Sequence, residues 1–196
     1  MAIEYEATFT NINKDEMRAR LRQAGANLIK PEFLQKRVVF NLPSGHEIPG
    51  GWLRVRDEQD QITMSLKIIN GAKIEDQEEI CLKVDNFSEA VDFLTAIGAQ
   101  RKAYQESRRE LWLLDGVEIT LDEWPYLEPY IEIEGKSEEA VKKASAKLNF
   151  DYGQALFCGI TTLYHNKYGL DEDYINNYIE RVTFDDANPF IKTKNN

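Results

Sequence analysis

The sequence predicts an α+β fold, in which an eight-stranded antiparallel β-barrel forms a tunnel and helices pack outside it. Eight segments of the chain have the pattern of strands, and eight strands are enough to close a barrel. Segments of helical periodicity alternate with them and need apolar strand faces to pack against. If the helices cover those faces from outside, the charged faces line a shared interior, which is then a candidate binding site.

The first strand shows the alternation on which this interpretation depends. Glu4 and Glu6 fall on one face, and apolar residues take positions 3, 5, 7 and 9 on the other face. The same phase holds for charged side chains of later strands, namely Arg54, Arg56, Lys67, Asp122, Glu132 and Glu134. For any one strand, a solvated outer face is the alternative interpretation, because antiparallel sheets commonly have one wet side.

The predicted strands follow one another in chain order, and helices lie in the longer connections. They cover 2–9, 34–42, 52–57, 62–69, 77–84, 101–114, 117–123 and 130–135. Asp115-Gly116 is a hairpin signal between the sixth and seventh strands, because both residues tolerate the positive φ of tight turns.

Five helices are predicted from capping residues and helical spacing. The first covers 14–24, begins at a capping box and ends at Gly25. Ser88 caps the second helix, which ends at Gly98, and Ser137 caps the third. A mostly apolar stretch at 154–167 forms the fourth helix, and 171–181 forms a short fifth helix.

Length and charge restrict the class of protein. We expect a tunnel domain over 1–170 and a helical extension with a mobile tail over 171–196, since the end is polar from about Asp185. The net charge of −10 disfavours nucleic acid and anionic membranes as partners, so an anionic ligand must be held by locally focused cations. The lack of a leader and of a long apolar run predicts a soluble cytoplasmic protein, and a homodimer is left open. Cys81 and Cys158 have no zinc-ligand spacing and are expected to be reduced thiols.

The inward charges predict two kinds of chemistry. The cations suit a compact polyanion, because Arg offers forked donors to phosphate and Lys offers a point charge. The Glu-x-Glu pairs at 4–6 and 132–134, together with Asp122, make an oxygen-only site that suits Mg²⁺ or Mn²⁺. Such an ion bridges phosphate oxygens and activates a water or a hydroxyl for in-line attack.

In this order of motifs the chain resembles the CYTH, or triphosphate tunnel metalloenzyme, family of class IV adenylate cyclases, thiamine triphosphatases and inorganic triphosphatases. The resemblance runs from about 3 to 169 and includes the opening Glu-x-Glu, the stretch Trp52–Arg56, Lys67, Arg109 and the two acidic strands around Asp122 and Glu132. It implies a metal side formed by Glu4, Glu6, Glu79, Asp122, Glu132 and Glu134. It also implies a triphosphate side formed by Arg37, Arg54, Arg56, Lys67 and Arg109, of which Lys67 and Arg109 are the expected catalytic residues.

Three positions depart from the pattern of that family. Thr8 replaces an expected Lys, Ser107 replaces a basic residue, and Cys81 replaces an acidic one. Arg37 is in a position to restore positive charge, and so is Arg108, although Arg108 lies out of phase with the other inward residues. The phase of Glu79 is ambiguous because Glu78 is adjacent.

Three functions stay open at this stage. The first is hydrolysis of a triphosphate-containing substrate, such as inorganic triphosphate, thiamine triphosphate or a nucleotide. The second is cyclisation of ATP, as in class IV adenylate cyclases, because both reactions use the same clamp. The third is a degenerate tunnel that binds a phosphorylated ligand without turnover. The remaining alternative is a purely structural domain, whose inward charges pair with one another. Trp52 and Trp124 suggest base stacking, but core packing explains them as well, so neither is assigned to the site.

Overall fold

The computed structural model describes residues 2–191. The strands are β1 (Ala2–Ile3), β2 (Tyr5–Phe9), β3 (Asn27–Asn41), β4 (Gly51–Asp57), β5 (Ile62–Ile69), β6 (Gln77–Val84), β7 (Gln100–Leu114), β8 (Val117–Glu123), β9 (Tyr130–Gly135) and β10 (Arg181–Val182). The helices are α1 (Lys14–Gln23), α2 (Phe87–Ala96), α3 (Glu138–Lys147), α4 (Ile160–Tyr168) and α5 (Glu172–Tyr178).

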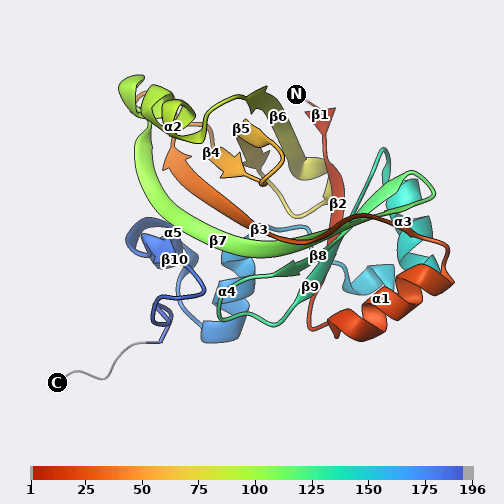
Figure 1. Cartoon of the computed structure of the whole chain (residues 1–196). Helices are drawn as coiled ribbons and strands as arrows, with labels where there is room; N and C mark the ends of the chain where they lie inside the picture. The colour runs from red at the N-terminus through yellow and green to blue at the C-terminus, as the bar shows by residue number, and fades with distance from the viewer. Residues whose placement is uncertain (1, 192–196) are drawn as a thin grey trace.

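The strands form one strongly curled sheet (Figure 1), whose order is β1-β6-β5-β4-β3-β7-β8-β9-β2. The predicted strand 2–9 appears as β1 and β2, which are separated by Glu4 alone. Because β1 pairs with β6 and β2 pairs with β9, this single segment connects the two ends of the antiparallel sheet. The predicted fold class, eight antiparallel strands with helices around them, is confirmed.

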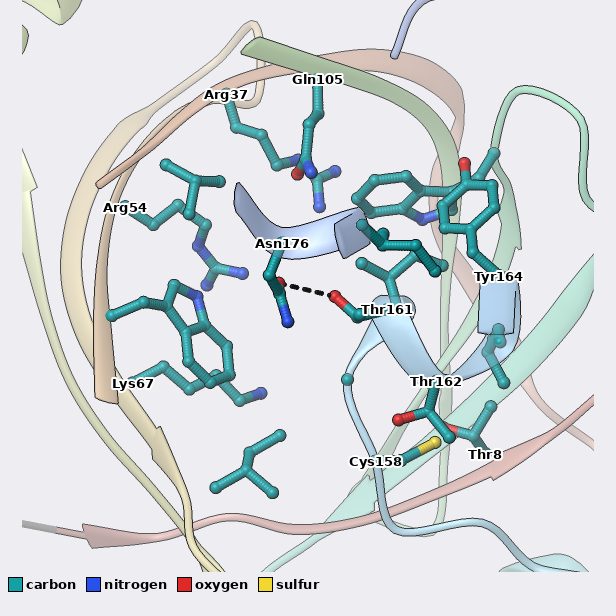
Figure 2. A pocket seen from close by; sticks show the side chains of 18 of the residues that line it. Thr8, Arg37, Arg54, Lys67, Gln105, Cys158, Thr161, Thr162, Tyr164 and Asn176 are labelled. Carbon is teal, nitrogen blue, oxygen red and sulfur yellow. Dashed lines mark hydrogen bonds between the residues drawn. The ribbon is translucent and has the colours of Figure 1, made fainter. Parts of the chain in front are cut away.

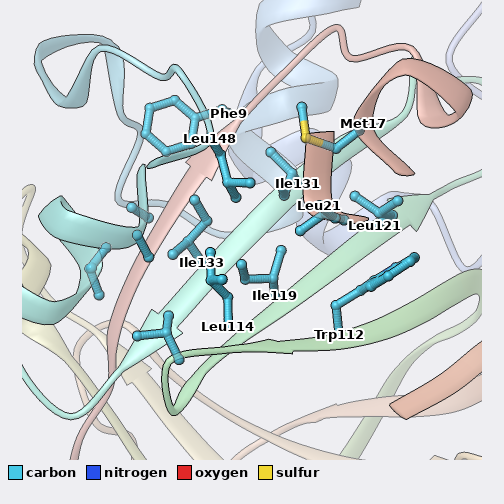
Figure 3. Packing of buried hydrophobic residues seen from close by; sticks show 14 of the residues in the cluster. Phe9, Met17, Leu21, Trp112, Leu114, Ile119, Leu121, Ile131, Ile133 and Leu148 are labelled. Carbon is cyan, nitrogen blue, oxygen red and sulfur yellow. The ribbon is translucent and has the colours of Figure 1, made fainter. Parts of the chain in front are cut away.

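The largest hydrophobic core lies outside the sheet, as the strand pattern predicts. In Figure 3, Ile119 of β8 and Ile131 and Ile133 of β9 point toward Met17 and Leu21 of α1 and toward Leu148 at the end of α3. The side chain of Asn13 accepts hydrogen bonds from the first turn of α1, and that of Ser137 does so for α3, as the sequence predicts. Since the apolar face of these strands is buried under helices, their alternate, charged face is directed to the interior.

A second helix layer covers the other half of the sheet. Ala90 and Leu94 of α2 pack on Val38, Phe40 and Val55 of β3 and β4. The N-cap of α2 is Asn86, whose side chain accepts hydrogen bonds from the Ser88 and Glu89 amides, so the prediction of Ser88 as the cap was wrong.

The beginnings of two elements also differ from the prediction. Strand β3 begins at Asn27 rather than at 34. The sequence does not reveal its first part, because irregular pairing on both sides of Lys30, close to Pro31, interrupts the alternation that marks a strand. Helix α4 begins at Ile160 rather than at 154, because the chain just before it is extended: Leu156 pairs with Thr8 in an isolated bridge. In both cases a long-range pairing determines the boundary.

The C-terminal segment completes the wall of the sheet. Helix α5 ends at Tyr178 rather than at 181, because the chain turns into strand β10, which was not predicted and which pairs in parallel with β7 at Tyr104 and Gln105. Phe190 is buried and stacks on Tyr164 of α4 at 3.9 Å between ring centroids, so the chain is packed at this residue. The mobile tail expected from about Asp185 stays a prediction, and 192–196 lie outside the described residues. Within 2–191, no helix has the length and apolar character needed to cross a membrane.

Candidate functional site

The curled sheet encloses a cavity of about 530 Å³. All but one of the residues that the sequence assigns to the site line this cavity: Glu4, Glu6, Arg37, Arg54, Arg56, Lys67, Glu79, Arg109, Glu132 and Glu134. The strands bring these side chains together because each of them occupies the inward phase of its strand. The ambiguity at Glu79 is resolved, since Glu79 faces the cavity and pairs with Lys67 in the β5–β6 register.

Four of the five cations form ion pairs across the cavity wall. Arg54 bonds to Glu79 at 2.9 Å, Arg56 to Glu58 at 2.6 Å, Lys67 to Glu4 at 2.7 Å, and Arg109 to Asp122 and Glu132 at 2.8 and 2.6 Å. Burial lowers the pKa of Lys67, but the carboxylates of Glu6 and Glu4 outweigh that effect, so its pKa is raised and the ammonium stays charged. Burial and the nearby Arg54 lower the pKa of Arg56 to about 10.

Arg37 differs from the other cations. Its guanidinium donates hydrogen bonds to the side chains of Gln35, at 2.8 Å, and Ser107, and it lies over the ring of Trp124 at 4.3 Å. In the part of the chain that the structure describes, no carboxylate pairs with it, and its Nε has no acceptor. Burial and three neighbouring arginines depress its pKa well below the usual value. Arg37 is therefore a buried cation whose charge is not balanced by a carboxylate of the described chain.

The carboxylates gather on the opposite side, where the first and last strands of the motif meet. Glu6 lies directly opposite Glu134 in the β2–β9 register, which places two like charges side by side. Burial, followed by the charges of neighbouring carboxylates, raises the pKa of Glu132 to about 8 and that of Glu134 to about 7. Burial and a hydrogen bond with Glu79 raise the pKa of Glu4 to about 8. Burial also tends to raise the pKa of Glu79, but its hydrogen bond with Glu4 and the charges of Arg54 and Lys67 outweigh that effect and hold this pKa far below its usual range. The raised pKa values indicate that burial and the crowding of carboxylates outweigh the nearby charges of Lys67 and Arg109 on this side of the cavity.

The donor set fits a hard divalent cation, because it consists of carboxylate oxygens crowded enough to hold protons. Among residues 2–191, no three acidic, His or Cys side chains are arranged closely enough to hold a metal ion as they stand. Metal binding therefore requires side-chain rotation, which frees carboxylates such as Glu4 and Glu132 from Lys67 and Arg109.

Asp122 is the predicted site residue that does not line the cavity. It is fully buried behind Arg109, and its oxygens accept hydrogen bonds from Arg109 and from the hydroxyl of Thr120. Its assignment as a metal ligand stays a prediction, since both oxygens are used in orienting Arg109.

The three departures from the family pattern have different surroundings. Thr8 points inward beside Cys158 and Thr162 (Figure 2) and has 3% of its surface exposed. Ser107 is buried and belongs to the hydrogen-bond network of Arg37. Cys81 is exposed and does not line the cavity. Arg108 lies outside the sheet, where it pairs with Glu123, so it does not replace a tunnel cation.

Several cavity residues were missed in the sequence. Gln105 shares the phase of Ser107 and Arg109 on β7, so a signal for it was present. Trp52, which was considered from the sequence and left unassigned, shares the phase of Arg54 on β4 and lines the cavity. Thr161 of α4 and Asn176 of α5 also line the cavity, and Figure 2 shows them facing the cations. Neither helix carries a motif that points to the cavity, so their position follows only from the packing of the C-terminal segment.

The fold and the cavity define an α+β protein with a charged interior inside a curled antiparallel sheet. The family model of the CYTH domain matches residues 3–160, and the chain belongs to this family. No curated protein sequence matches the chain.

Solved structures with the same fold include adenylate cyclase-like proteins. A putative adenylate cyclase from Vibrio parahaemolyticus matches with a TM-score of 0.69 at 12% identity, over 83% of this chain and 97% of that chain. A protein from Pyrococcus horikoshii OT3 matches with a TM-score of 0.65 at 19% identity, over 78% and 93%. A putative adenylyl cyclase from Hippeastrum, described as having a dominant triphosphatase activity, matches with a TM-score of 0.55 at 16% identity, over 88% and 99%. At these identities the likeness shows the fold alone.

Proposed function

We propose that the protein binds a triphosphate-containing substrate in the cavity and hydrolyses it with the help of Mg²⁺ or Mn²⁺. The observation that carries this proposal is Arg37, a buried guanidinium without a carboxylate partner among the described residues. An unpaired buried cation is costly, and a bound anion offsets that cost. The surrounding arginines and Lys67 make the preferred anion a multiply charged one.

The residues divide into two sets with different tasks. Arg37, Arg54 and Arg56 hold the phosphate chain, and Lys67 and Arg109 stabilise the negative charge that develops on the transferred phosphoryl group. Glu4, Glu6, Glu79, Glu132 and Glu134 hold the divalent ion, with Asp122 either joining them or keeping Arg109 oriented. A divalent ion held by these carboxylates would supply Lewis-acid chemistry, which neutralises phosphate charge and lowers the pKa of an attacking water. The family membership and the triphosphatase activity described for the Hippeastrum protein support this division.

A second candidate is binding without turnover. It is favoured by Thr8, which places a neutral side chain opposite Glu132, and by the existing ion pairs, which compensate most of the inward charge. In this candidate, Ser107 and Gln35 fix the guanidinium of Arg37 for an anionic ligand. The same residues would bind the ligand, but the transition state for hydrolysis would lack one cation. This loss costs about 3 kcal/mol by analogy with the loss of one electrostatic donor.

The experiment is an assay of the purified chain against inorganic triphosphate, ATP and thiamine triphosphate, each with Mg²⁺, Mn²⁺ or chelator. Release of orthophosphate indicates hydrolysis, and release of pyrophosphate with cyclic AMP indicates cyclisation. Two neighbouring arginines on β7 provide a matched pair: Arg109→Gln should abolish turnover and weaken binding, whereas Arg108→Gln, on the outer face, should change neither. Tight binding without product supports the second candidate, and no binding of any triphosphate contradicts both.

A further inference from the structure

We propose that the C-terminal segment of the cavity wall is a subsite for an uncharged organic group attached to the phosphate chain, so that the ligand is an organic triphosphate rather than inorganic triphosphate. The proposal rests on the proposed function. We call this segment, formed by α4, α5 and β10, the cap. The residues assigned to the subsite are Gln105, Thr161 and Asn176.

The strand register places the cap next to the phosphate clamp. On β7, residues 108–114 pair with β8, and just before them Tyr104 and Gln105 pair with β10, so β10 continues the wall beyond the end of β8. Gln105 has Arg37 as its neighbour on β3 and Val182 as its neighbour on β10. Gln105 therefore lies on the wall between Arg37 of the phosphate clamp and Val182 of the cap.

The polar groups of the subsite are neutral and have free hydrogen-bonding capacity. The hydroxyl of Thr161 donates to Asn176 Oδ1 at 3.0 Å, and Figure 2 shows the amide nitrogen of Asn176 directed into the cavity. Within residues 2–191, neither that nitrogen nor the side-chain amide of Gln105 makes a hydrogen bond. Two amides offer donors and acceptors at once, which suits a neutral organic group, whereas a phosphate offers acceptors only.

The rest of the cap surface is mostly apolar. Ile160, Leu163, Ile175, Ile179 and Val182 line the same cavity, and the cap adds the carboxylate of Glu172 but no cation. Lys102 also lines the cavity but belongs to β7, so the cap itself offers no positive charge to a second cluster of phosphates. Apolar walls with a few fixed polar groups are typical of sites for organic molecules.

The cap is also the part of the cavity that lies beyond the family match. The match ends at residue 160, and, apart from Ile160 itself, the cavity residues that α4, α5 and β10 supply follow it. The shared part carries the charges, and the additional part carries the neutral surface. We therefore infer that the cap sets which triphosphate is accepted.

The test measures affinities by calorimetric titration in the presence of Mg²⁺, with inorganic triphosphate, the common nucleoside triphosphates and thiamine triphosphate as probes. At least one organic triphosphate should bind about tenfold more tightly than inorganic triphosphate. Asn176→Leu and, independently, Gln105→Leu should remove most of this preference and leave the affinity for inorganic triphosphate within about twofold. Asn177→Leu is the matched control, because Asn177 is exposed on the same helix and bonds to Asp173 outside the cavity.

Two results overturn the subsite. One is an affinity for inorganic triphosphate equal to that for every organic probe. The other is a loss that is the same for inorganic and organic probes in both Asn176→Leu and Gln105→Leu, with circular dichroism showing intact folding. If the wild-type chain binds no triphosphate of either kind, the proposed function itself fails, and that outcome is distinct from a loss of preference.

Discussion

The carboxylate of Asp122 accepts two hydrogen bonds from Arg109, at 2.8 and 2.9 Å, although Asp122 has no exposed surface of its own. Arg109 in turn reaches the cavity and bonds to Glu132. The fully buried acid thus fixes the plane of a guanidinium that the ligand can meet. This arrangement gives Asp122 a role in positioning, which competes with the metal-binding role expected from the sequence.

Substitution of Asp122 separates these two roles. In chelator, Asp122→Asn should lower the free energy of unfolding by about 3 kcal/mol, because it leaves the Arg109 charge with one fewer anion in a buried place. Chemical denaturation with and without Mg²⁺ measures this change. Replacement of a metal ligand should not lower the free energy of unfolding in chelator, since its removal relieves repulsion among the remaining carboxylates.

Glu134→Gln is the variant that should show this opposite behaviour. Glu134 faces Glu6 across β2 and β9, and its raised pKa reflects burial and that repulsion. In chelator the variant should be as stable as the wild type or more stable, whereas stabilisation by Mg²⁺ and metal-dependent binding of triphosphate should fall about tenfold or more. Glu132→Gln should weaken the metal requirement in the same way. If chelator leaves triphosphate binding unchanged in the wild type, the carboxylates are structural.

Arg37 should matter more for the ligand than for the fold. Arg37→Gln should lower triphosphate affinity by roughly 10- to 100-fold, which corresponds to the loss of one hydrogen bond to a charged group. Without ligand, the same variant should be no less stable, because it removes a buried charge that has no carboxylate partner among the described residues. Arg37→Lys is the control that keeps the charge and loses the forked geometry. A large loss of stability in Arg37→Gln with unchanged affinity would assign Arg37 to the core.

The stability of the metal-free protein should fall as the pH rises from about 5 to about 8. The folded chain keeps protons on Glu4 and Glu132 up to about pH 8 and on Glu134 up to about pH 7, whereas the unfolded chain releases them near 4.5. Since the native state binds more protons in this window, each retained proton lowers stability by about 1.4 kcal/mol per pH unit. The depressed pKa of Glu79 acts only below its usual value and does not oppose this trend.

Thermal unfolding in chelator and in Mg²⁺ across this range provides the measurement. The stabilisation by Mg²⁺ should be larger at about pH 8 than at about pH 5.5, because the ion then replaces protons that have been lost. If the stability of the metal-free protein instead rises between about pH 5 and about pH 8, these carboxylates are ionised in the folded state, and something other than protonation relieves their mutual repulsion.

The inward direction of the charged side chains could be predicted because it depends on a local property, the two-residue period of a strand. Glu4, Arg54 and Glu132 lie in the cavity for this reason, and the apolar residues between them lie under α1, α2 or α3. The beginning of β3 could not be predicted, because irregular pairing near Pro31 disturbs the same period.

The partners of the charged groups could not be predicted, because they depend on the register between strands. Arg54 of β4 pairs with Glu79 of β6, two strands away in the sheet, and Arg37 has no acidic partner in the described chain, although both share the phase of their neighbours. The cap was missed for a related reason. Asn176 reaches the cavity only because α5 packs through Ile175 on a core that includes Trp124 and Tyr130, which are distant in the sequence.

The last prediction concerns Thr8, the neutral residue at a position where the family pattern has a cation. Thr8 lies opposite Glu132 in the β2–β9 register and lines the cavity, so Thr8→Lys should place an ammonium beside that carboxylate and within reach of a phosphate chain. We expect the raised pKa of Glu132 to fall and triphosphate binding or turnover to rise by about tenfold. Thr8→Met, which adds similar length without charge, is the control for crowding against Cys158 and Thr162. If both variants bind and turn over triphosphate as the wild type does, the missing cation is not limiting, because Arg37 already supplies the charge.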